Sequence, residues 1–243
     1  MLDLSGQVAV VTGGSRGIGR AIALALAEAG ADVAINYQYS KESADEVCNL
    51  ISNLGVRTGA YKANVGKDEE VRSMVSSVLR DLGPVSILVN CAGIGIYGPL
   101  ETTSTADWER LMAVNARGPF ILCRETLPYL KQAGAGHIIN VASVVGVKGY
   151  VNQAAYSASK HALLGMTKVL AQEAQAYGIR VHALCPGGVD TDMAAQARPD
   201  LDRSILMSPQ EMADIVLFLL GQRGNAVIDL ICVRRATAAP WFD

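Results

Sequence analysis

The sequence predicts a single α/β domain in which helices cover both faces of a doubly wound parallel sheet. Short β-branched runs alternate with helical patterns along the 243 residues, which is typical of parallel strands joined by crossover helices. A glycine-rich turn joins the first strand pattern directly to the first helical one. No linker, repeat or block of charge interrupts the chain, so we expect one domain over 1–243 with a Rossmann fold.

The first strand, turn and helix form a candidate dinucleotide site. Residues 8–11 are a β-branched run, and 20–29 carry an Ala/Leu helical pattern. Between them, Gly13, Gly17 and Gly19 stand in the spacing G-x-x-x-G-x-G. Glycines here let backbone N–H groups and the start of the helix approach a pyrophosphate. A tight turn without a ligand would also use glycines, but the strand–turn–helix context favours a cofactor.

The second strand is predicted over 32–36, and the residues at its end indicate which cofactor is bound. An NAD-binding unit usually carries an acid there, which binds the ribose 2′-hydroxyl. This chain has Asn36, Tyr37 and Gln38 instead. Arg16, inside the glycine turn, offers a guanidinium for a 2′-phosphate, and the Asn36 amide would add a neutral hydrogen bond. The pattern predicts NADP, although Arg16 alone would also suit an exposed loop without a ligand.

Four elements follow in alternation. Helices are predicted over 43–54 and 68–82, and strands over 57–62 and 87–89. Apolar residues of 68–82 recur at helical spacing, so they belong to the core. The strand at 87–89 ends in an Asn-Cys-Ala-Gly segment at 90–93, whose small residues would let the backbone pass close to a flat cofactor.

A long helical stretch is predicted next. Residues 105–114 form a helix that leads to Asn115, and 120–130 continue it. We expect bends near Pro119 and Pro128, because proline lacks the backbone N–H that a helix interior requires.

The strongest chemical signal lies in the following strand and helix. Residues 137–141 predict a strand with Ser143 just beyond its end, and 153–176 predict a helix that carries Tyr156 and Lys160. Positions i and i+4 of a helix share a face, so the phenol and the ammonium would be neighbours. A nearby cation would lower the tyrosine pKa from about 10 and make Tyr156 a proton donor or acceptor. Taken alone, such a pair is often a solvated helix face.

The last elements complete the alternation. Strands are predicted over 180–184 and 227–233, with a helix over 209–220 between them and a tail over 234–243. The polar segment 189–208 has weak periodicity and follows the carboxyl end of a strand. That position favours a flap over the site, although an ordinary surface excursion would have the same composition.

Composition excludes several classes of protein. Half of the residues are hydrophobic, and 21 basic against 23 acidic residues give a formal charge of −2, so neither nucleic acid nor an anionic membrane is an expected partner. No apolar run approaches the ~18 residues of a membrane span, and the first residues lack the features of a secretory signal. The five cysteines and the histidines His137, His161 and His182 lack metal-type spacing, so we expect no metal site, and reduced thiols in a cytoplasmic protein.

The order and spacing of these motifs resemble the short-chain dehydrogenase/reductase family over nearly the whole chain. The family's cofactor motif matches residues 12–19, and its N-A-G motif matches 90–93, with Cys91 where a second asparagine is common. The resemblance places the catalytic set on Asn115, Ser143, Tyr156 and Lys160. It implies that the cofactor is held by Gly13, Ser15, Arg16, Gly17, Ile18, Gly19, Asn36, Tyr37, Asn64, Val65, Asn90, Ala92, Gly93, Tyr156, Lys160, Pro186, Gly187, Val189 and Thr191.

The resemblance also implies a role for each catalytic residue. Ser143 would bind the carbonyl oxygen, where negative charge develops, and Tyr156 would protonate it. Lys160 would lower the pKa of Tyr156 and contact the nicotinamide ribose, while Asn115 would hold a water that links Lys160 to solvent. In isolation, Ser143 would suit a strand-end cap and Asn115 a hydrogen bond at a helix break.

Within the family, the N-terminal motifs look like those of 3-oxoacyl-[acyl-carrier-protein] reductases, which use NADPH. The C-terminus departs from that group, because residues 228–235 replace the usual T-G-x-x-x-x-V-D-G-G-type segment and look more like members that act on assorted ketones and alcohols. The expected function is hydride transfer between NADP(H) and a carbonyl or secondary alcohol, with a 3-oxoacyl thioester, which an acyl carrier protein would carry, as one candidate. Another small ketone and a non-catalytic NADP-binding sensor or scaffold are the alternatives.

Family resemblance further implies a homotetramer. In the family, the long helices equivalent to 105–130 and 153–176 pair between subunits. The altered C-terminus could weaken the second interface and leave a dimer.

Overall fold

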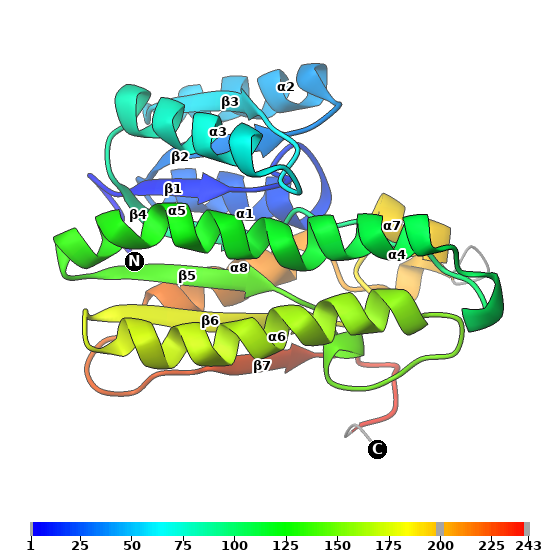
Figure 1. The fold of residues 1–243 in the computed structure, drawn as a ribbon. Coiled ribbons are helices and arrows are strands. Elements are labelled where there is room, and N and C mark those ends of the chain that lie inside the picture. Colours follow the sequence, from blue (N-terminus) through cyan, green and yellow to red (C-terminus); the bar gives the residue numbers. More distant parts are fainter. Residues whose placement is uncertain (1, 198–201, 241–243) are drawn as a thin grey trace.

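The computed structural model describes residues 2–197 and 202–240 and contains the predicted doubly wound sheet (Figure 1). Seven strands, all parallel, lie in the order β3-β2-β1-β4-β5-β6-β7. The strands are β1 Val8–Val11, β2 Asp32–Tyr37, β3 Thr58–Lys62, β4 Val85–Asn90, β5 Gly136–Val141, β6 Ile179–Pro186 and β7 Leu230–Val233. The order reverses direction between β1 and β4, and this switch point at the carboxyl ends of the strands is where open sheets bind ligands.

Helices cover both faces of the sheet, as the alternation predicts. The α-helices are α1 Gly17–Glu28, α2 Lys41–Ser52, α3 Asp68–Asp81, α4 Thr105–Met112, α5 Gly118–Ala133, α6 Ala154–Gln175, α7 Asp192–Ala197 and α8 Pro209–Leu220. Short turns of helix are η1 Leu100–Thr102, η3 Val144–Gly146 and η4 Arg203–Ile205, and η2 Ala113–Arg117 is a π-helix. Apolar side chains of α1, α2 and α8 pack on one face, and those of α3, α5 and α6 pack on the other.

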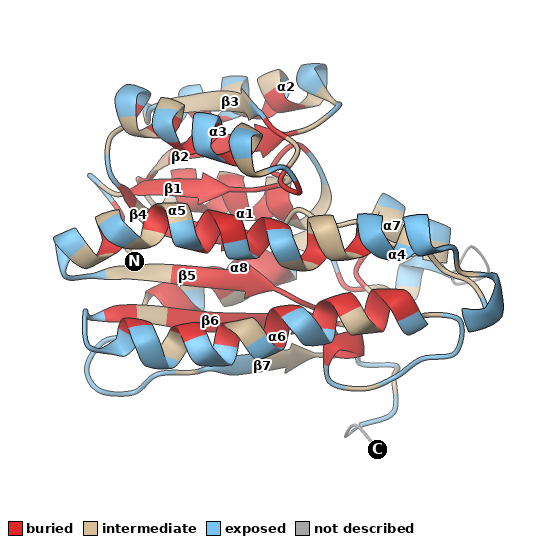
Figure 2. Ribbon diagram, in the orientation of Figure 1, coloured by how far each residue is buried: buried red, intermediate tan, exposed pale blue. Residues whose placement is uncertain are grey.

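Burial explains why the central strands are apolar on both faces. In β1 every residue is buried, and in β4 all but one are (Figure 2). A strand covered on both faces needs apolar side chains at every position rather than at alternate ones. The edge strand β7, by contrast, is only partly buried along its length.

The predicted long helix over 105–130 differs most from the structure. It consists of α4 and α5 joined by the π-helix Ala113–Arg117. Pro119 lies in the first turn of α5, where its missing N–H costs nothing, and Pro128 lies inside α5 without ending it. The α-helical pattern is therefore interrupted by a π-helix, a form that is frequent at functional sites, and the expected bends stay a prediction.

Other boundaries shift by a few residues. The helix predicted over 43–54 begins at Lys41 and ends at Ser52, and the strand predicted over 227–233 begins only at Leu230. The segment 189–208 contains α7 and η4, with residues 198–201 outside the described part. Of the predicted tail, 241–243 also lie outside it. In the described residues, no helix is both long and apolar enough to cross a membrane.

Candidate active site

Four predicted catalytic residues come together beyond the carboxyl ends of β4, β5 and β6. Ser143 follows β5 directly, Tyr156 and Lys160 occupy the first two turns of α6, and Asn115 lies in the π-helix. The Lys160 ammonium lies 5.9 Å from the centre of the Tyr156 ring, so the spacing of four residues does bring the two side chains together. Asn115, Tyr156 and Lys160 are buried and Ser143 is half-buried.

The Asn115 amide fixes the loop that follows β4. Its Oδ1 accepts a hydrogen bond from the Ile94 backbone N–H at 2.9 Å, and its Nδ2 donates to the Ile94 carbonyl at 2.9 Å and to Ser159 Oγ at 3.0 Å. Both amide protons are thus used within the protein. Only an acceptor position of Oδ1 remains for a ligand water, and the water relay through Asn115 stays a prediction.

Gly93 separates Asn115 from Lys160. A Cβ at Gly93 would lie 3.4 Å from Asn115 Oδ1 and 3.7 Å from Lys160 Nζ. The absence of a side chain therefore keeps the space beside the ammonium open.

Ser143 caps a turn of helix and also faces the phenol. Its Oγ accepts a hydrogen bond from the Val145 backbone N–H at 3.3 Å and lies 3.4 Å from the Pro186 carbonyl oxygen, to which it donates. The Ser143 hydroxyl also lies close enough to the Tyr156 phenol to lower its pKa, against the effect of burial. Both interpretations of Ser143, as a cap and as a site residue, therefore fit the same geometry.

Burial is the largest influence on the pKa values of both Tyr156 and Lys160. It lowers the pKa of Lys160 to about 8 and raises the pKa of Tyr156, with Tyr97 adding to the rise and the Ser143 hydroxyl opposing it. Lys160 is not among the groups that shift the Tyr156 pKa here, and its expected effect on that pKa stays a prediction. The Lys160 ammonium instead donates to the Val141 carbonyl at 3.0 Å, and the phenol loses more hydration than the distant cation returns.

Two residues that the sequence did not single out cover the phenol. The Tyr97 ring meets the Tyr156 ring edge-on, with 5.6 Å between centroids. Met193, in α7, places its sulfur 4.0 Å from the Tyr156 hydroxyl. The segment 189–208 therefore contacts the site, and its role as a flap stays a prediction. In the sequence, these two residues could have been found from the position of Tyr97 shortly after the N-A-G segment and from that of Met193 within the segment 189–208.

The glycine turn is packed too tightly for side chains. A Cβ at Gly19 would lie 2.3 Å from the Gly13 carbonyl oxygen, and Gly13 and Gly17 have φ of +64° and +53°, which favour glycine. Thr12 Oγ1 accepts hydrogen bonds at 3.0 Å from the backbone N–H groups of both Cys91 and Ala92. The turn and the N-A-G segment thus form one continuous wall.

Arg16 pairs with the flap in the absence of a ligand. Its Nη1 lies 3.1 Å from Asp192 Oδ2, with side chains 71% and 67% exposed. The neighbouring residues also meet, since a Cβ at Gly17 would lie 3.2 Å from Thr191 Cγ2. The cofactor turn and the flap are therefore in direct contact.

The Asn36 amide has a structural role. It is buried, accepts a hydrogen bond from the Gly13 N–H at 3.4 Å and donates to the Ala63 carbonyl at 3.0 Å. Further donor contacts reach the carbonyls of Tyr37 and Tyr61. The expected neutral hydrogen bond from Asn36 to a 2′-phosphate is therefore not available without breaking these bonds.

The remaining predicted cofactor residues lie along the same edge of the sheet. Asn90 donates to Asn140 Oδ1 at 2.8 Å and leaves its own buried Oδ1 without a partner in the described part of the chain. Asn64 Oδ1 accepts from the Gly66 N–H at 2.9 Å. The others are in the glycine turn, in the first turn of α1, at the end of β2, in the loop after β3, or at and just beyond the end of β6: Ser15, Ile18, Tyr37, Val65, Pro186, Gly187 and Val189.

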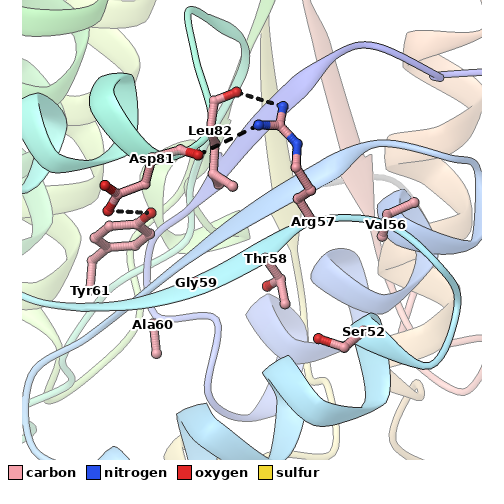
Figure 3. Close-up of a pocket in the computed structure, with 9 residues that line it drawn as sticks. All are labelled: Ser52, Val56, Arg57, Thr58, Gly59, Ala60, Tyr61, Asp81 and Leu82. Carbon is pink, nitrogen blue, oxygen red and sulfur yellow. Dashed lines mark hydrogen bonds between the residues drawn. The ribbon is translucent and has the colours of Figure 1, made fainter.

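A hollow of about 530 Å³ lies away from this edge, beside β3 (Figure 3). Arg57 crosses it and donates to the Asp32 carboxylate, to the Leu82 carbonyl at 2.7 Å and to the Asp81 carbonyl at 3.5 Å. Tyr61 donates to Asp81, and burial together with that carboxylate raises the pKa of Tyr61 to about 12. These polar groups are bonded to one another. They hold β3 against the end of α3, and none of them is a free reactive group in the hollow.

The three histidines contact groups within the protein. His137 and His182 stack with 5.7 Å between ring centroids, and His182 Nδ1 contacts the Ile228 carbonyl at 2.7 Å. His161 Nδ1 lies 2.9 Å from the Ser157 carbonyl. Within 2–197 and 202–240, no cluster of three or more His, Cys, Asp or Glu side chains has the arrangement of a metal site.

Comparison with known proteins gives consistent results. A family model described as short chain dehydrogenase matches residues 7–202. The 3-oxoacyl-[acyl-carrier-protein] reductase FabG of Staphylococcus epidermidis is 40% identical over 198 residues, 82% of this chain and 81% of that protein. A short-chain type dehydrogenase/reductase of Picea abies is 36% identical over 92% of this chain and 89% of its own.

Solved structures agree over almost the whole chain. An alcohol dehydrogenase from Thermococcus sibiricus, complexed with 5-hydroxy-NADP, superposes with a TM-score of 0.89 at 28% identity, covering 97% of this chain and 99% of its own. A blue fluorescent protein from a metagenomic library, in complex with NADPH, has a TM-score of 0.87 at 38% identity, covering 98% and 100%.

Proposed function

The chain belongs to the short-chain dehydrogenase/reductase family, and on this premise we propose that it is an NADP(H)-dependent oxidoreductase. It transfers hydride between the nicotinamide and a carbonyl or secondary alcohol. The observation that carries the proposal is the meeting of Asn115, Ser143, Tyr156 and Lys160 at the carboxyl edge of the sheet. A non-catalytic sensor or scaffold has no chemical need for that set.

The empty space of the site fits a dinucleotide. Side chains are missing where a cofactor would approach the backbone, at the glycine turn and at Gly93 beside Lys160. Arg16 is exposed at the turn, and β2 ends without an acid that would repel a 2′-phosphate. Structural relatives bound to NADP or NADPH support the choice of cofactor. When bound, NADPH supplies the hydride.

The chain's own residues handle the proton. Burial keeps the Tyr156 phenol protonated, and the nearby Ser143 hydroxyl gives the site a second hydroxyl group for a carbonyl oxygen. Burial lowers the pKa of Lys160 to about 8, so its ammonium can release a proton near neutral pH and the resulting amine can take one up again. Met193 has to move before a substrate can reach the phenol, since its sulfur lies 4.0 Å from the hydroxyl.

Two classes of substrate are candidates for this site. FabG relatives support a 3-oxoacyl thioester on an acyl carrier protein, while the altered 228–235 segment favours another small ketone. The test is oxidation of NADPH with a 3-oxoacyl thioester and with a panel of free ketones. Turnover that is lost in Tyr156→Phe supports the enzyme; NADPH binding without turnover of any substrate supports the sensor or scaffold.

A homotetramer, or a dimer, is also part of the proposal. Large apolar side chains are exposed on α4, α5 and α6 and in the turn that follows α6: Trp108, Phe120, Val169 and Tyr177. Burying them against a second copy would remove apolar surface from water. Light scattering at micromolar concentration measures the mass, and a monomer contradicts this part. We further place the protein in the cytoplasm, which the five unpaired cysteines support.

A further inference from the structure

In the described part of the chain, one guanidinium nitrogen at the carboxyl edge of the sheet is buried without a partner. Arg235 follows the end of β7 by two residues, and its Nη1 is buried without a hydrogen-bond acceptor. In the described part of the chain, no carboxylate forms an ion pair with it. A buried donor left unsatisfied is costly, and more so on a charged group. Such a group indicates an acceptor that comes from outside the chain.

The stem of Arg235 lies against the neck of the flap. Its Cδ is 3.5 Å from the place where a Cβ of Gly188 would stand, and Leu206 closes the other side at 3.0 Å. Gly188 and Val189 are joined to Met207 by a backbone hydrogen bond of 3.1 Å and a parallel bridge. The stem of Arg235 therefore lies where the two ends of the segment 189–208 meet.

The tail holds this position through Arg234. Its Nη1 donates to the carbonyls of Arg235 at 3.1 Å and Ala238 at 2.9 Å. The backbone around Arg235 is thus curled into a defined turn. One of the two neighbouring arginines organises the tail, and the other remains unpaired.

In the described part of the segment 189–208, two carboxylates already have partners. Asp190 bonds Arg203 at 2.6 Å, and Asp192 bonds Arg16 at 3.1 Å. Neither carboxylate neutralises Arg235 in this arrangement.

Position excludes the cofactor phosphates as the partner of Arg235. The glycine turn follows β1, and β7 is four strands away in the sheet; at ~4.8 Å per strand the separation is ~19 Å. Ser143 is much nearer, because its Oγ contacts the Pro186 carbonyl at 3.4 Å and Gly187 donates to Val233 at 2.7 Å. Covalent reach places the guanidinium within ~15 Å of the Ser143 hydroxyl.

We propose that Arg235 binds an anionic oxygen group, a carboxylate or a phosphate, at the end of the substrate remote from the reacting carbonyl. The substrate class is therefore an anionic ketone, and Arg235 is a specificity-determining residue. This rests on the proposed function and adds to it the chemistry of the substrate's second end. A guanidinium fits both groups, since its planar fork matches two anionic oxygens.

The test uses ketones that differ only at the remote end. Levulinate and its longer methyl-ketone homologues are compared with their methyl esters and with keto-alkyl phosphates, in wild type, Arg235→Met, Arg235→Lys and the charge-matched control Arg223→Met. We expect Arg235→Met to lower kcat/KM for the anions by roughly ten- to a hundredfold through KM. The esters, KM for NADPH, Tm and the control should stay unchanged, and Arg235→Lys should recover part of the loss.

The relative kcat/KM of the wild type for the keto acids and for the keto-alkyl phosphates shows whether the site prefers a carboxylate or a phosphate. Equal losses for acid and ester, or no loss for either anion, would overturn the role of Arg235. If wild type turns over none of these ketones, the proposed function is in question. Calorimetry with the longest keto acid and the NADP-loaded protein then tests the anion site independently of turnover. Binding to wild type that is lost in Arg235→Met supports the anion site, and no binding to wild type refutes the anion site.

Discussion

We expect the 2′-phosphate of NADPH to replace the Asp192 carboxylate as the partner of Arg16. Substitutions of these two residues should then have opposite effects on NADPH binding. Arg16→Ala should weaken NADPH binding, because charge-assisted hydrogen bonds to a phosphate contribute about 1.5–3 kcal/mol. Asp192→Asn should strengthen it, because Arg16 is then free of its partner at 3.1 Å.

The exposure of the pair sets the magnitudes. With side chains 71% and 67% exposed, the ion pair contributes only about 0.2–1 kcal/mol. Asp192→Asn should therefore lower the Kd for NADPH by roughly 1.5- to fivefold. Arg16→Ala loses the phosphate contact but no longer has to break the pair, which leaves a loss of about 0.5–2.8 kcal/mol, or roughly two- to a hundredfold.

The assay is Kd by fluorescence titration and kcat/KM for NADPH and NADH in wild type and both variants, and in the double variant. Asp190→Asn is the matched control, since it removes the same charge from the same segment but breaks the bond to Arg203 instead. NADH values should hardly change in any variant, and Asp192→Asn should have no effect once Arg16 is alanine. A wild-type preference for NADH, or equal losses with both cofactors in Arg16→Ala, would refute the reasoning.

Three further outcomes are expected. Tyr156→Phe should abolish turnover and leave the Kd for NADPH nearly unchanged, because only the proton is lost; substantial residual turnover would remove Tyr156 from the acid role. Lys160→Met should stabilise the cofactor-free protein at pH 7 by up to about 3 kcal/mol, since the pKa falls from 10.5 to about 8 on folding. Between these two pKa values the folded state binds fewer protons than the unfolded state, so the stability of the wild type should rise from pH 8 to 10.5. The stabilisation by Lys160→Met should shrink over the same range, and urea unfolding of both proteins across that window measures it. Gly19→Ala should cost about 1–3 kcal/mol, because its Cβ would lie 2.3 Å from the Gly13 carbonyl; in thermal melts Gly165→Ala, which meets no atom within 4 Å, should cost nothing.

The fold and the grouping of the site were accessible from sequence because both depend on short-range signals. A β-branched run followed at once by glycines defines β1 and its turn wherever the rest of the chain lies. Once the strands are known to be parallel, Asn90, Ser143 and Pro186 must meet, since carboxyl ends of parallel strands share one edge.

The π-helix at Asn115 carries no such local signal. Ala113 to Arg117 contains no glycine or proline, and the prolines that suggested a bend are not its cause. The extra residue in the turn accompanies the bonds between the Asn115 amide and Ile94, 21 residues away. A helix that is distorted by a tertiary contact can be predicted only after the contact is known.

The protonation of Tyr156 was inaccessible for a related reason. Helical spacing fixes that Lys160 is a neighbour, but it fixes neither the direction of the ammonium nor the hydration of the phenol. In the structure the ammonium bonds the Val141 carbonyl, and Tyr97 and Met193 cover the phenol. Burial therefore outweighs the cation, and the phenol keeps its proton while the site is closed. A general acid has to hold its proton until the substrate arrives, so this closed state is suited to carbonyl reduction, with displacement of Met193 as the step that exposes the proton.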